Sequence, residues 1–245
     1  MADDFYLFAN CNFVPDRYPD WQAAYDDLAK YVWSSEHTTK TYYFGIPFDY
    51  AHDFNKTTSM FAFEVYGSRE VGPLRSPRPP RLPRHDPIPH QNPPASTTGL
   101  DLSHYRLITG FLDLPGTRPE ASIMQDIRIT CTSPSARTAL ISSLTTLVNG
   151  IEDQGRRNGG AGGVLTYMAF ESLDDEVGVR VFGRWDTRED MERFIRREDV
   201  GAFWMGNKEN VKAMEQRGYL PNGKGWLHRG SGFAGEERGK GRARI

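Results

Sequence analysis

Polar and ionisable residues stand among apolar ones in three segments that alternate as strands do. They are Asn10 and Asn12 in residues 5–13, Glu64 and Tyr66 in residues 59–67, and Arg128 in residues 125–131. A guanidinium can pair with a phenolate or a carboxylate, and amide and phenol groups can hydrogen-bond a polar substrate atom. Together, these residue types suit the binding and deprotonation of a weakly acidic organic molecule.

The segment FYLFANCNF (5–13) alternates as a half-buried strand does. One face is wholly apolar, from Phe5 to Phe13, and is expected to pack on helices. The other, mixed face carries Tyr6, Phe8, Asn10 and Asn12 and is expected to point into a cavity. Asparagine is unfavourable in strands and needs partners when buried. The two amides either bond each other, water or nearby backbone, or they hold a polar ligand atom.

The segment QDIRITC (125–131) shows the same alternation. Ile127 and Ile129 are expected to face helices, and Arg128 to face the cavity. Arg128 either pairs with a substrate anion or forms a salt bridge with Glu64, which the alternation places on an inward face together with Tyr66.

Three further residues, Tyr43, Trp185 and His104, are candidates for the site together with Tyr66. Tyr43, Tyr66 and Trp185 suit the wall of a pocket for a flat aromatic ligand, with ordinary core packing as the alternative. His104 is a candidate general base, or else a surface or hydrogen-bonded histidine. No histidine or cysteine spacing typical of a metal site is present, and no nucleophile motif is visible.

The composition excludes several classes of partner. The 245 residues include 30 Lys and Arg against 32 Asp and Glu, so no global field favours nucleic acid or an anionic membrane. No apolar run approaches the roughly 20 residues of a membrane span, and the acidic start MADDFYLF lacks the pattern of a secretory signal. Cys11 and Cys131 are expected to be buried thiols. We therefore expect a cytoplasmic protein.

The elements follow the same order in both halves of the chain. The first half is predicted to be a strand (5–13), a helix opening at Pro19, and two strands (40–48 and 59–67). The second half is predicted to be a strand (125–131), a helix capped by Ser133, and two strands (163–171 and 177–186). Each half is thus β-α-β-β, with a further helix and strand expected after it, which is the ferredoxin-like pattern.

The ends of the third strands support a duplication. VYGSRE (65–70) aligns with RWDTRE (184–189), and in the second copy Thr187 and Asp190 open a helix as in a capping box. In the first copy, nine prolines fall between Pro73 and Pro94 and forbid that helix. Residues 73–96 are therefore either a flexible flap or intron-derived residues of an incorrect gene model.

These boundaries give a domain organisation. Residues 1–112 form the first repeat, with a disordered insertion at 73–96, and residues 113–124 link it to the second repeat at 125–228. The tail at 229–245, rich in glycine and charge, is expected to be disordered.

The order of elements, with GRWDTREDMERFIRREDVGAF (183–203) after the third strand of the second half, resembles the antibiotic biosynthesis monooxygenase family, and the duplication resembles its fungal two-repeat members. The resemblance implies an α+β fold in which two repeats close a dimeric α+β barrel within one chain, around a ligand cavity. The family commonly carries a histidine where this chain has Phe194. This departure argues against haem ligation.

The resemblance also implies a cofactor-independent monooxygenase that oxidises an anthrone- or hydroquinone-like aromatic polyketide in secondary metabolism, with molecular oxygen as co-substrate. Tyr66, His104, Arg128 and Trp185 are the expected catalytic residues. Tyr6, Asn10, Asn12, Tyr43 and Glu64 are expected to bind substrate. The alternatives are a cyclase, dehydratase or isomerase in the same cavity, or a non-catalytic small-molecule-binding barrel. We expect no metal, and either a monomeric pseudo-dimer or a homodimer.

Overall fold

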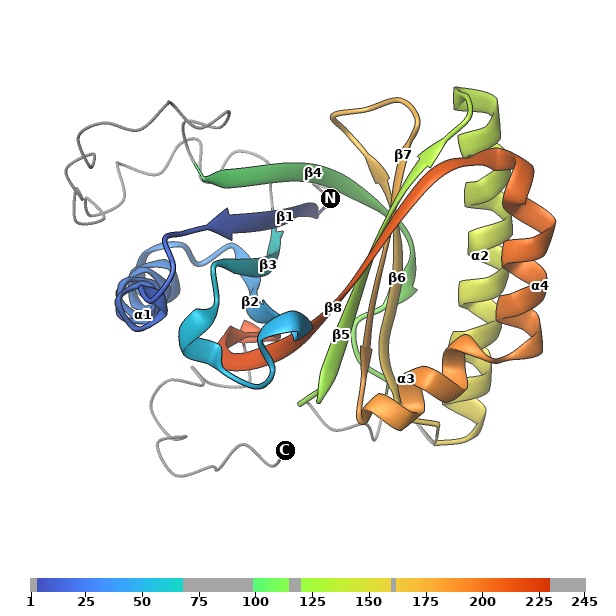
Figure 1. Ribbon diagram of the computed structural model, residues 1–245. Coiled ribbons are helices and arrows are strands. Elements are labelled where there is room, and N and C mark those ends of the chain that lie inside the picture. The colour runs from blue at the N-terminus through green and yellow to red at the C-terminus, as the bar shows by residue number, and fades with distance from the viewer. Residues whose placement is uncertain (1–3, 68–98, 115–119, 160–161, 230–245) are drawn as a thin grey trace. The chain divides into compact units, whose positions relative to one another are not determined.

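The computed structural model describes residues 4–67, 99–114, 120–159 and 162–229. The chain divides into two compact units: Met1–Leu102 together with Asn222–Ile245 (unit 1), and Ser103–Pro221 (unit 2). Each unit is an antiparallel sheet with helices on one face (Figure 1).

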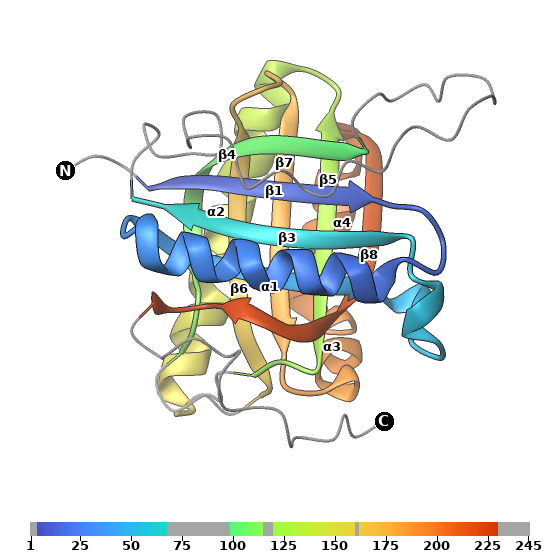
Figure 2. The same ribbon diagram turned by 90° about the vertical axis from the view of Figure 1, so that its left-hand side faces the viewer.

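Unit 1 contains β1 (Phe5–Asn12), α1 (Tyr18–Ser35), β2 (Thr39–Pro47) and β3 (Ser59–Tyr66). β3 is the central strand and pairs antiparallel with β1 and β2. The helix α1 lies along one face of these strands (Figure 2). Two short 3-10 turns, Phe48–Tyr50 and Phe54–Lys56, connect β2 to β3.

The core of unit 1 lies between α1 and the sheet. The apolar face predicted for β1 packs there, with Phe5, Leu7, Ala9 and Cys11 buried in one cluster with residues of α1. The helical spacing of Tyr25, Ala29 and Val32 puts their side chains on the face of α1 that covers the sheet. The alternation of residues 5–13 thus predicted the helix-covered face of β1 correctly.

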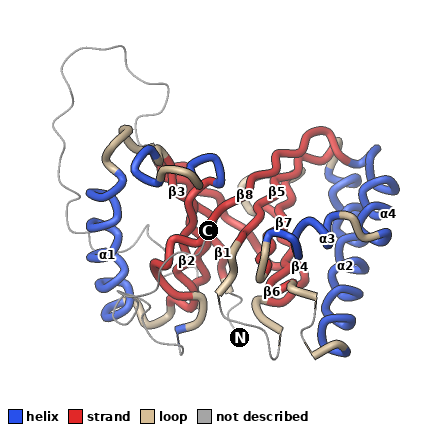
Figure 3. Tube along the Cα trace, turned by 60° about the horizontal axis from the view of Figure 1, so that its bottom comes forward, coloured by secondary structure: helices blue, strands red, loops and turns tan. Residues whose placement is uncertain are grey.

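Unit 2 contains β5 (Ile123–Cys131), α2 (Pro134–Arg157), β6 (Val164–Ser172), β7 (Gly178–Trp185), α3 (Arg188–Ile195), α4 (Glu198–Asn207) and a 3-10 turn (Lys208–Asn210). β7 is central and pairs with β5 and β6. The helices α2 and α4 run side by side on the same face of this sheet (Figure 3). The buried cluster beneath them includes Ile127, Ile129 and Cys131, which confirms the face predicted for β5.

Local signals start α2 and α3 as predicted. The Ala136 amide donates to Ser133 Oγ at 3.1 Å at the start of α2. The Asp190 amide donates to Thr187 Oγ1 at 3.1 Å at the start of α3, and the Thr187 hydroxyl donates to Asp190 Oδ2 at 2.7 Å. These bonds satisfy backbone donors that the first turn of a helix leaves open.

The two long strands β4 (Leu100–Phe111) and β8 (Val211–Trp226) each have one end in each unit. Within unit 1, the Asn12 amide donates to Gly99 O just before β4, at 2.5 Å. Within unit 2, β4 pairs with β6 from Tyr105 onward, and β8 pairs with β5 up to Tyr219. The final residues of β8 then neighbour β2 in unit 1. The strand that the sequence analysis placed at the end of the first half therefore pairs mainly inside unit 2.

Neighbouring strands follow the order β1-β3-β2-β8 and β8-β5-β7-β6-β4. All observed pairs in the registers above are antiparallel, so the predicted α+β class with two ferredoxin-like β-α-β-β segments is confirmed. The proline-rich segment 73–96 and residues 230–245 of the predicted tail lie outside the described residues.

Cys11 and Cys131 are both buried and unbonded to one another, as predicted. In the described parts of the chain, no helix has the length and apolar character needed to cross a membrane.

Candidate functional site in unit 2

A pocket of about 250 Å³ lies at one end of the sheet of unit 2, beside the turn from β6 to β7. All five strands of the unit contribute to it. Its lining consists of Ser103, Tyr105, Arg128, Ile129, Thr130, Ser172, Asp174, Asp175, Gly178, Val179, Ala213 and Glu215. The pocket combines a cation, three carboxyl groups and a phenol.

Two residues of opposite charge, on neighbouring strands, line this pocket. Arg128 on β5 and Glu215 on β8 are partners in the antiparallel register, so their side chains leave the same face of the sheet. The Arg128 side chain is 32% exposed, and Glu215 is exposed. Among the described residues, Glu215 forms no ion pair with a lysine, an arginine or a histidine. Its carboxylate is therefore available as a proton acceptor.

A buried ion pair lies next to Arg128 on the same face. Arg180 Nε and Nη2 donate to the two Asp126 carboxylate oxygens at 2.5 and 2.6 Å, and both side chains are almost fully buried. Arg128 Nε lies 3.7 Å from Asp126 Oδ2, so one carboxylate serves two guanidinium groups.

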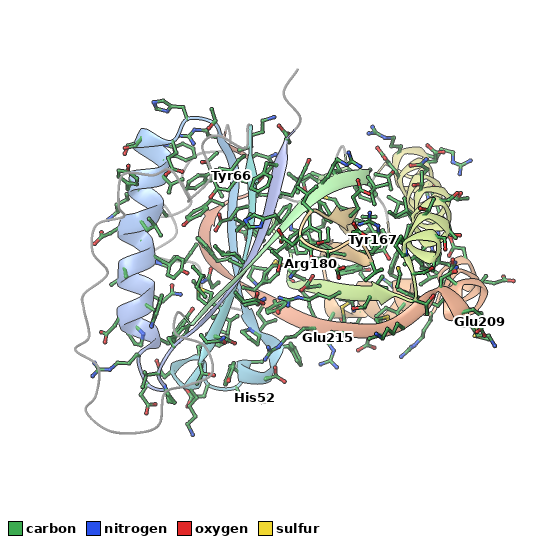
Figure 4. The ribbon with its side chains drawn as sticks, turned by 90° about the horizontal axis from the view of Figure 1, so that it is seen from above. His52, Tyr66, Tyr167, Arg180, Glu209 and Glu215 are labelled. Carbon is green, nitrogen blue, oxygen red and sulfur yellow. The ribbon has the colours of Figure 1, made fainter. Side chains whose placement is uncertain are left out.

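This pairing holds Arg180 in its charged form. Burial lowers the pKa of Arg180, but the adjacent Asp126 charge and its hydrogen bonds raise that pKa above its ordinary value. The Arg180 guanidinium carbon also lies 5.3 Å from the centroid of the Tyr105 ring. Tyr105 is thereby held between the buried pair and the pocket that it lines. Figure 4 shows Arg180 and Glu215 on the sheet, with Tyr167 on the side of α2.

His104 lies at the edge of the pocket and contacts Asp174, which lines it. Its Nδ1 lies 3.0 Å from Asp174 Oδ1, and its backbone amide donates to Asp174 Oδ2 at 2.7 Å. The Asp174 amide in turn donates to Ser172 Oγ at 3.1 Å. His104 therefore fixes a carboxylate that lines the pocket, although its own side chain is not part of the lining. Its predicted role as a general base stays a prediction.

The sequence analysis assigned Glu64 and Tyr66 to a cavity-facing side, and that placement is wrong. In the registers of unit 1, Glu64 stands opposite Leu7 and Tyr42, and Tyr66 stands opposite Phe5. These neighbours belong to the cluster under α1, so β3 turns these side chains toward the helix. The alternation gave the correct period for β3 but the wrong face, because all its residues are buried and neither face is marked by polarity.

The alternative salt bridge between Glu64 and Arg128 is likewise not formed. Glu64 accepts a hydrogen bond from the Tyr66 hydroxyl, and Arg128 has Asp126 as its ion-pair partner.

Trp185 also lies on a helix-covered face, that of the sheet of unit 2. It is fully buried, and its ring centroid lies 5.5 Å from that of Phe194 on α3. The Tyr167 and Phe194 rings are 4.8 Å apart in the same cluster. The expectation that Trp185 forms a pocket wall is therefore wrong, and its position matches the packing alternative. Phe194, which stands where the resemblance would place a histidine, is a buried apolar core residue.

The remaining predicted binding residues lie on the helix-free face of unit 1. Tyr6 stacks on Phe63 with ring centroids 6.4 Å apart. Tyr43 is opposite Phe63 in the β2–β3 register and so shares that face. Asn10 is half-buried and Asn12 is exposed on the same face of β1. Their predicted contacts with substrate stay predictions.

The sequence analysis missed Asp126, Arg180 and Glu215. The signal for two of them was present: Asp126 shares its strand face with Arg128, and VGVRVFGRW carries Arg180 among apolar residues. Glu215 lies in an exposed stretch of β8 that has no apolar alternation. Only the register of β8 on β5 brings it opposite Arg128.

Within the described ranges, no group of three or more histidine, cysteine, aspartate or glutamate side chains is arranged to hold a metal ion. Asp126 and Asp174 are both engaged, by Arg180 and His104.

The fold resembles those of several solved structures. A proposed monooxygenase from Fusobacterium nucleatum matches with a TM-score of 0.68 at 8% identity, over 90% of this chain and 93% of the other. A proposed monooxygenase from Lactobacillus acidophilus NCFM matches with a TM-score of 0.64 at 7% identity, over 89% and 94%. An anthrone oxidase-like protein matches with a TM-score of 0.57 at 12% identity, over 90% and 92%.

No protein-family model matches the sequence. No curated protein matches it either. At these identities the structural matches establish a shared fold alone.

Proposed function

We propose that this protein is a cofactor-independent monooxygenase that oxidises a phenolic aromatic compound, and that the acidic group of the substrate binds in the pocket of unit 2. The observation that carries this proposal is the Arg128–Glu215 register pair in that pocket. The fold shared with proposed monooxygenases and an anthrone oxidase-like protein supports the class of reaction.

The pocket residues supply the first step, which is the removal of a proton. Glu215 accepts the proton of the acidic C–H or O–H group, and Arg128 stabilises the resulting anion by its charge. The buried Asp126–Arg180 pair holds the surrounding face rigid, so that Arg128 is positioned before substrate arrives.

The substrate anion then reacts with oxygen. The electron-rich anion transfers one electron to O2, and the carbon radical and superoxide combine to a peroxide. Loss of water from a peroxide at a former methylene carbon leaves a carbonyl group, so CH2 and O2 become C=O and H2O. One oxygen atom thus enters the product and the other leaves as water.

The volume of the pocket limits what it can enclose. Pockets for drug-sized ligands usually measure about 300–1,000 Å³, and this one measures about 250 Å³. We propose that it encloses the acidic end of the substrate. Tyr105 supplies an aromatic surface at that point.

Oxygen uptake with a panel of anthrones and hydroquinones tests the proposal. We expect the wild-type protein to exceed the spontaneous rate with at least one substrate, and Glu215→Gln to lower kcat by about 100-fold or more, as for loss of a general base. Glu209→Gln, an exposed glutamate on the turn before β8, is the matched control and should leave the rate unchanged. Uptake that never exceeds the spontaneous rate would refute the oxygenase function.

The same residues favour a second reaction class. Arg128 and Glu215 can move a proton without oxygen, which suffices for isomerisation, cyclisation or dehydration of a reactive aromatic intermediate. Turnover under strictly anaerobic conditions that is lost in Glu215→Gln would support this class over the oxygenase.

A further inference from the structure

Unit 1 contains a buried carboxyl group that has no part in the pocket of unit 2. Glu64 lies in the middle of β3 on the face covered by α1, and is only 7% exposed. Within the part of the chain that the structure describes, its single hydrogen-bond partner is the Tyr66 hydroxyl, and it forms no ion pair with a lysine or an arginine. A phenol donates a hydrogen bond but brings no positive charge.

The groups beside Glu64 in the buried cluster under α1 are phenols and a thiol. Tyr42 lies opposite Glu64 on β2, and Cys11 on β1 bonds the Tyr25 hydroxyl of α1 at 2.7 Å in the same cluster. Beyond these groups, Glu36 at the end of α1 adds a second negative charge. The cation on this side of unit 1 is Arg229, which follows β8 and donates to the backbone carbonyl oxygens of Trp33, Glu36 and Thr39. Among the described residues it forms no ion pair with Glu64, so an ionised Glu64 would have no direct counter-charge.

Burial raises the pKa values of the groups in this cluster. Burial raises the pKa of Glu64 to about 7, the Tyr66 hydrogen bond opposes that rise, and Glu36 adds to it. Burial likewise raises the pKa of Cys11 to about 11, and the pKa values of Tyr25, Tyr42 and Tyr66 well above their ordinary value. Glu64 is thus the member of the cluster that titrates near neutral pH.

We propose that Glu64 and Tyr66 form a proton-linked switch in unit 1, in which Glu64 is protonated while α1 is packed on the sheet, and its ionisation loosens that packing. The buried negative charge has no counter-charge, so exposing it to water lowers its free energy. The movement available to unit 1 is a local separation of α1 from β1, β2 and β3. This proposal does not depend on the reaction proposed above.

The sign of the pH dependence follows from proton linkage. A glutamate in the unfolded chain has its pKa near 4.5, and the folded chain holds the proton until about pH 7. Between these values the folded state binds more protons than the unfolded state, so stability falls as pH rises. The two values correspond to a roughly 300-fold smaller folding equilibrium constant above pH 7 than below pH 4.5.

Thermal unfolding from pH 4 to 9 tests the switch, with the wild-type protein compared with Glu64→Gln. The amide has nearly the shape of the protonated carboxyl group but cannot ionise. We expect the wild-type Tm to fall from pH 5 to pH 7 relative to that of Glu64→Gln, and the two curves to run parallel above pH 8. Glu189→Gln, an exposed glutamate on α3, is the matched control and should follow the wild type.

Hydrogen exchange locates the effect. Above pH 7, corrected exchange should accelerate in α1 of the wild type but not in α2, nor in α1 of Glu64→Gln. If Glu64→Gln does not fold, infrared spectroscopy of the wild type tests the proposal instead. We expect the carbonyl band of a protonated carboxyl group at pH 6 and its loss by pH 8. Parallel Tm curves at every pH, or absence of that band at pH 6, would overturn the proposal.

Discussion

Asp126 in unit 2 and Glu64 in unit 1 are both more than nine-tenths buried on central parts of their sheets, but they meet different partners. Asp126 receives two hydrogen bonds from the guanidinium of Arg180, whereas Glu64 receives one from a neutral phenol. The first forms a bidentate ion pair with a buried guanidinium. The second has its pKa raised by burial to about 7.

Burial can therefore have opposite consequences for a carboxyl group, depending on whether a cation lies beside it. A buried carboxylate with a bidentate arginine is a fixed structural charge, because separating the pair leaves two uncompensated ions. A buried carboxyl group without a cation remains stable by keeping its proton, and so becomes sensitive to pH. Unit 2 thus has a rigid charged surface beside a pocket, and unit 1 has a titratable core.

The largest effect on stability is expected from removing one partner of the buried Asp126–Arg180 ion pair. Arg180→Met leaves the Asp126 charge buried without its main counter-ion, and should lower the free energy of unfolding by about 3–5 kcal/mol. Chemical denaturation at pH 7 measures this loss. The double variant Asp126→Leu/Arg180→Met should recover most of it, since no lone charge remains. A loss below about 1 kcal/mol in the single variant would contradict the comparison.

The pH-sensitive carboxyl group should produce the next effect. A pKa of about 7 in place of 4.5 for Glu64 makes folding about 3 kcal/mol less favourable above pH 7 than below pH 4.5. The difference in unfolding free energy between Glu64→Gln and the wild type should therefore grow from pH 5 to pH 7. Denaturation curves at fixed pH values measure it. If this difference in unfolding free energy stayed constant with pH, Glu64 would not titrate in the folded protein. The two buried carboxyl groups would then not differ in their response to pH.

A smaller effect on stability is expected from Arg229, whose side chain contacts the end of α1 in unit 1. Arg229 donates to the carbonyl oxygens of Glu36 and Thr39 at 2.8 and 3.0 Å, and also to that of Trp33. Its guanidinium carbon lies 4.9 Å from the Trp33 ring centroid. Arg229→Gln should cost about 2 kcal/mol, because charged hydrogen bonds to the end of α1 are lost. Equal stability would show that this end of α1 is held by packing alone.

The smallest effect concerns how the first turn of each main helix is held. Ser133 caps α2 through its side chain, whereas Arg17 at the start of α1 makes no side-chain cap. Ser133→Ala should cost about 1 kcal/mol, and Arg17→Ala should be close to neutral. Thermal unfolding compares the two. Equal losses would show that capping is not what distinguishes the helices.

The fold was predictable wherever a local signal existed. Alternation in residues 5–13 and 125–131, helical spacing in α1, and the Ser133 and Thr187 caps gave the β-α-β-β order of each half. The candidate site was predictable in part. Arg128 was identified and lines the pocket, but Glu64, Tyr66 and Trp185 were assigned to the wrong face.

These errors share one physical cause. Every residue of β3 is buried, and seven of the eight residues of β7 are buried, so polarity does not mark which face meets a helix. Alternation then gives the period of a strand but not its orientation. The orientation follows from the partners across the sheet, such as Leu7 opposite Glu64.

The sequence by itself determined the α+β class, the order of the elements and the face of each strand that shows a clear apolar alternation, since these depend on neighbours a few residues apart. Tertiary structure alone decided that β4 and β8 each have an end in both units, that Glu215 stands opposite Arg128, and that Arg180 reaches Asp126. Strand register joins residues that are far apart in the chain, and no local pattern encodes it.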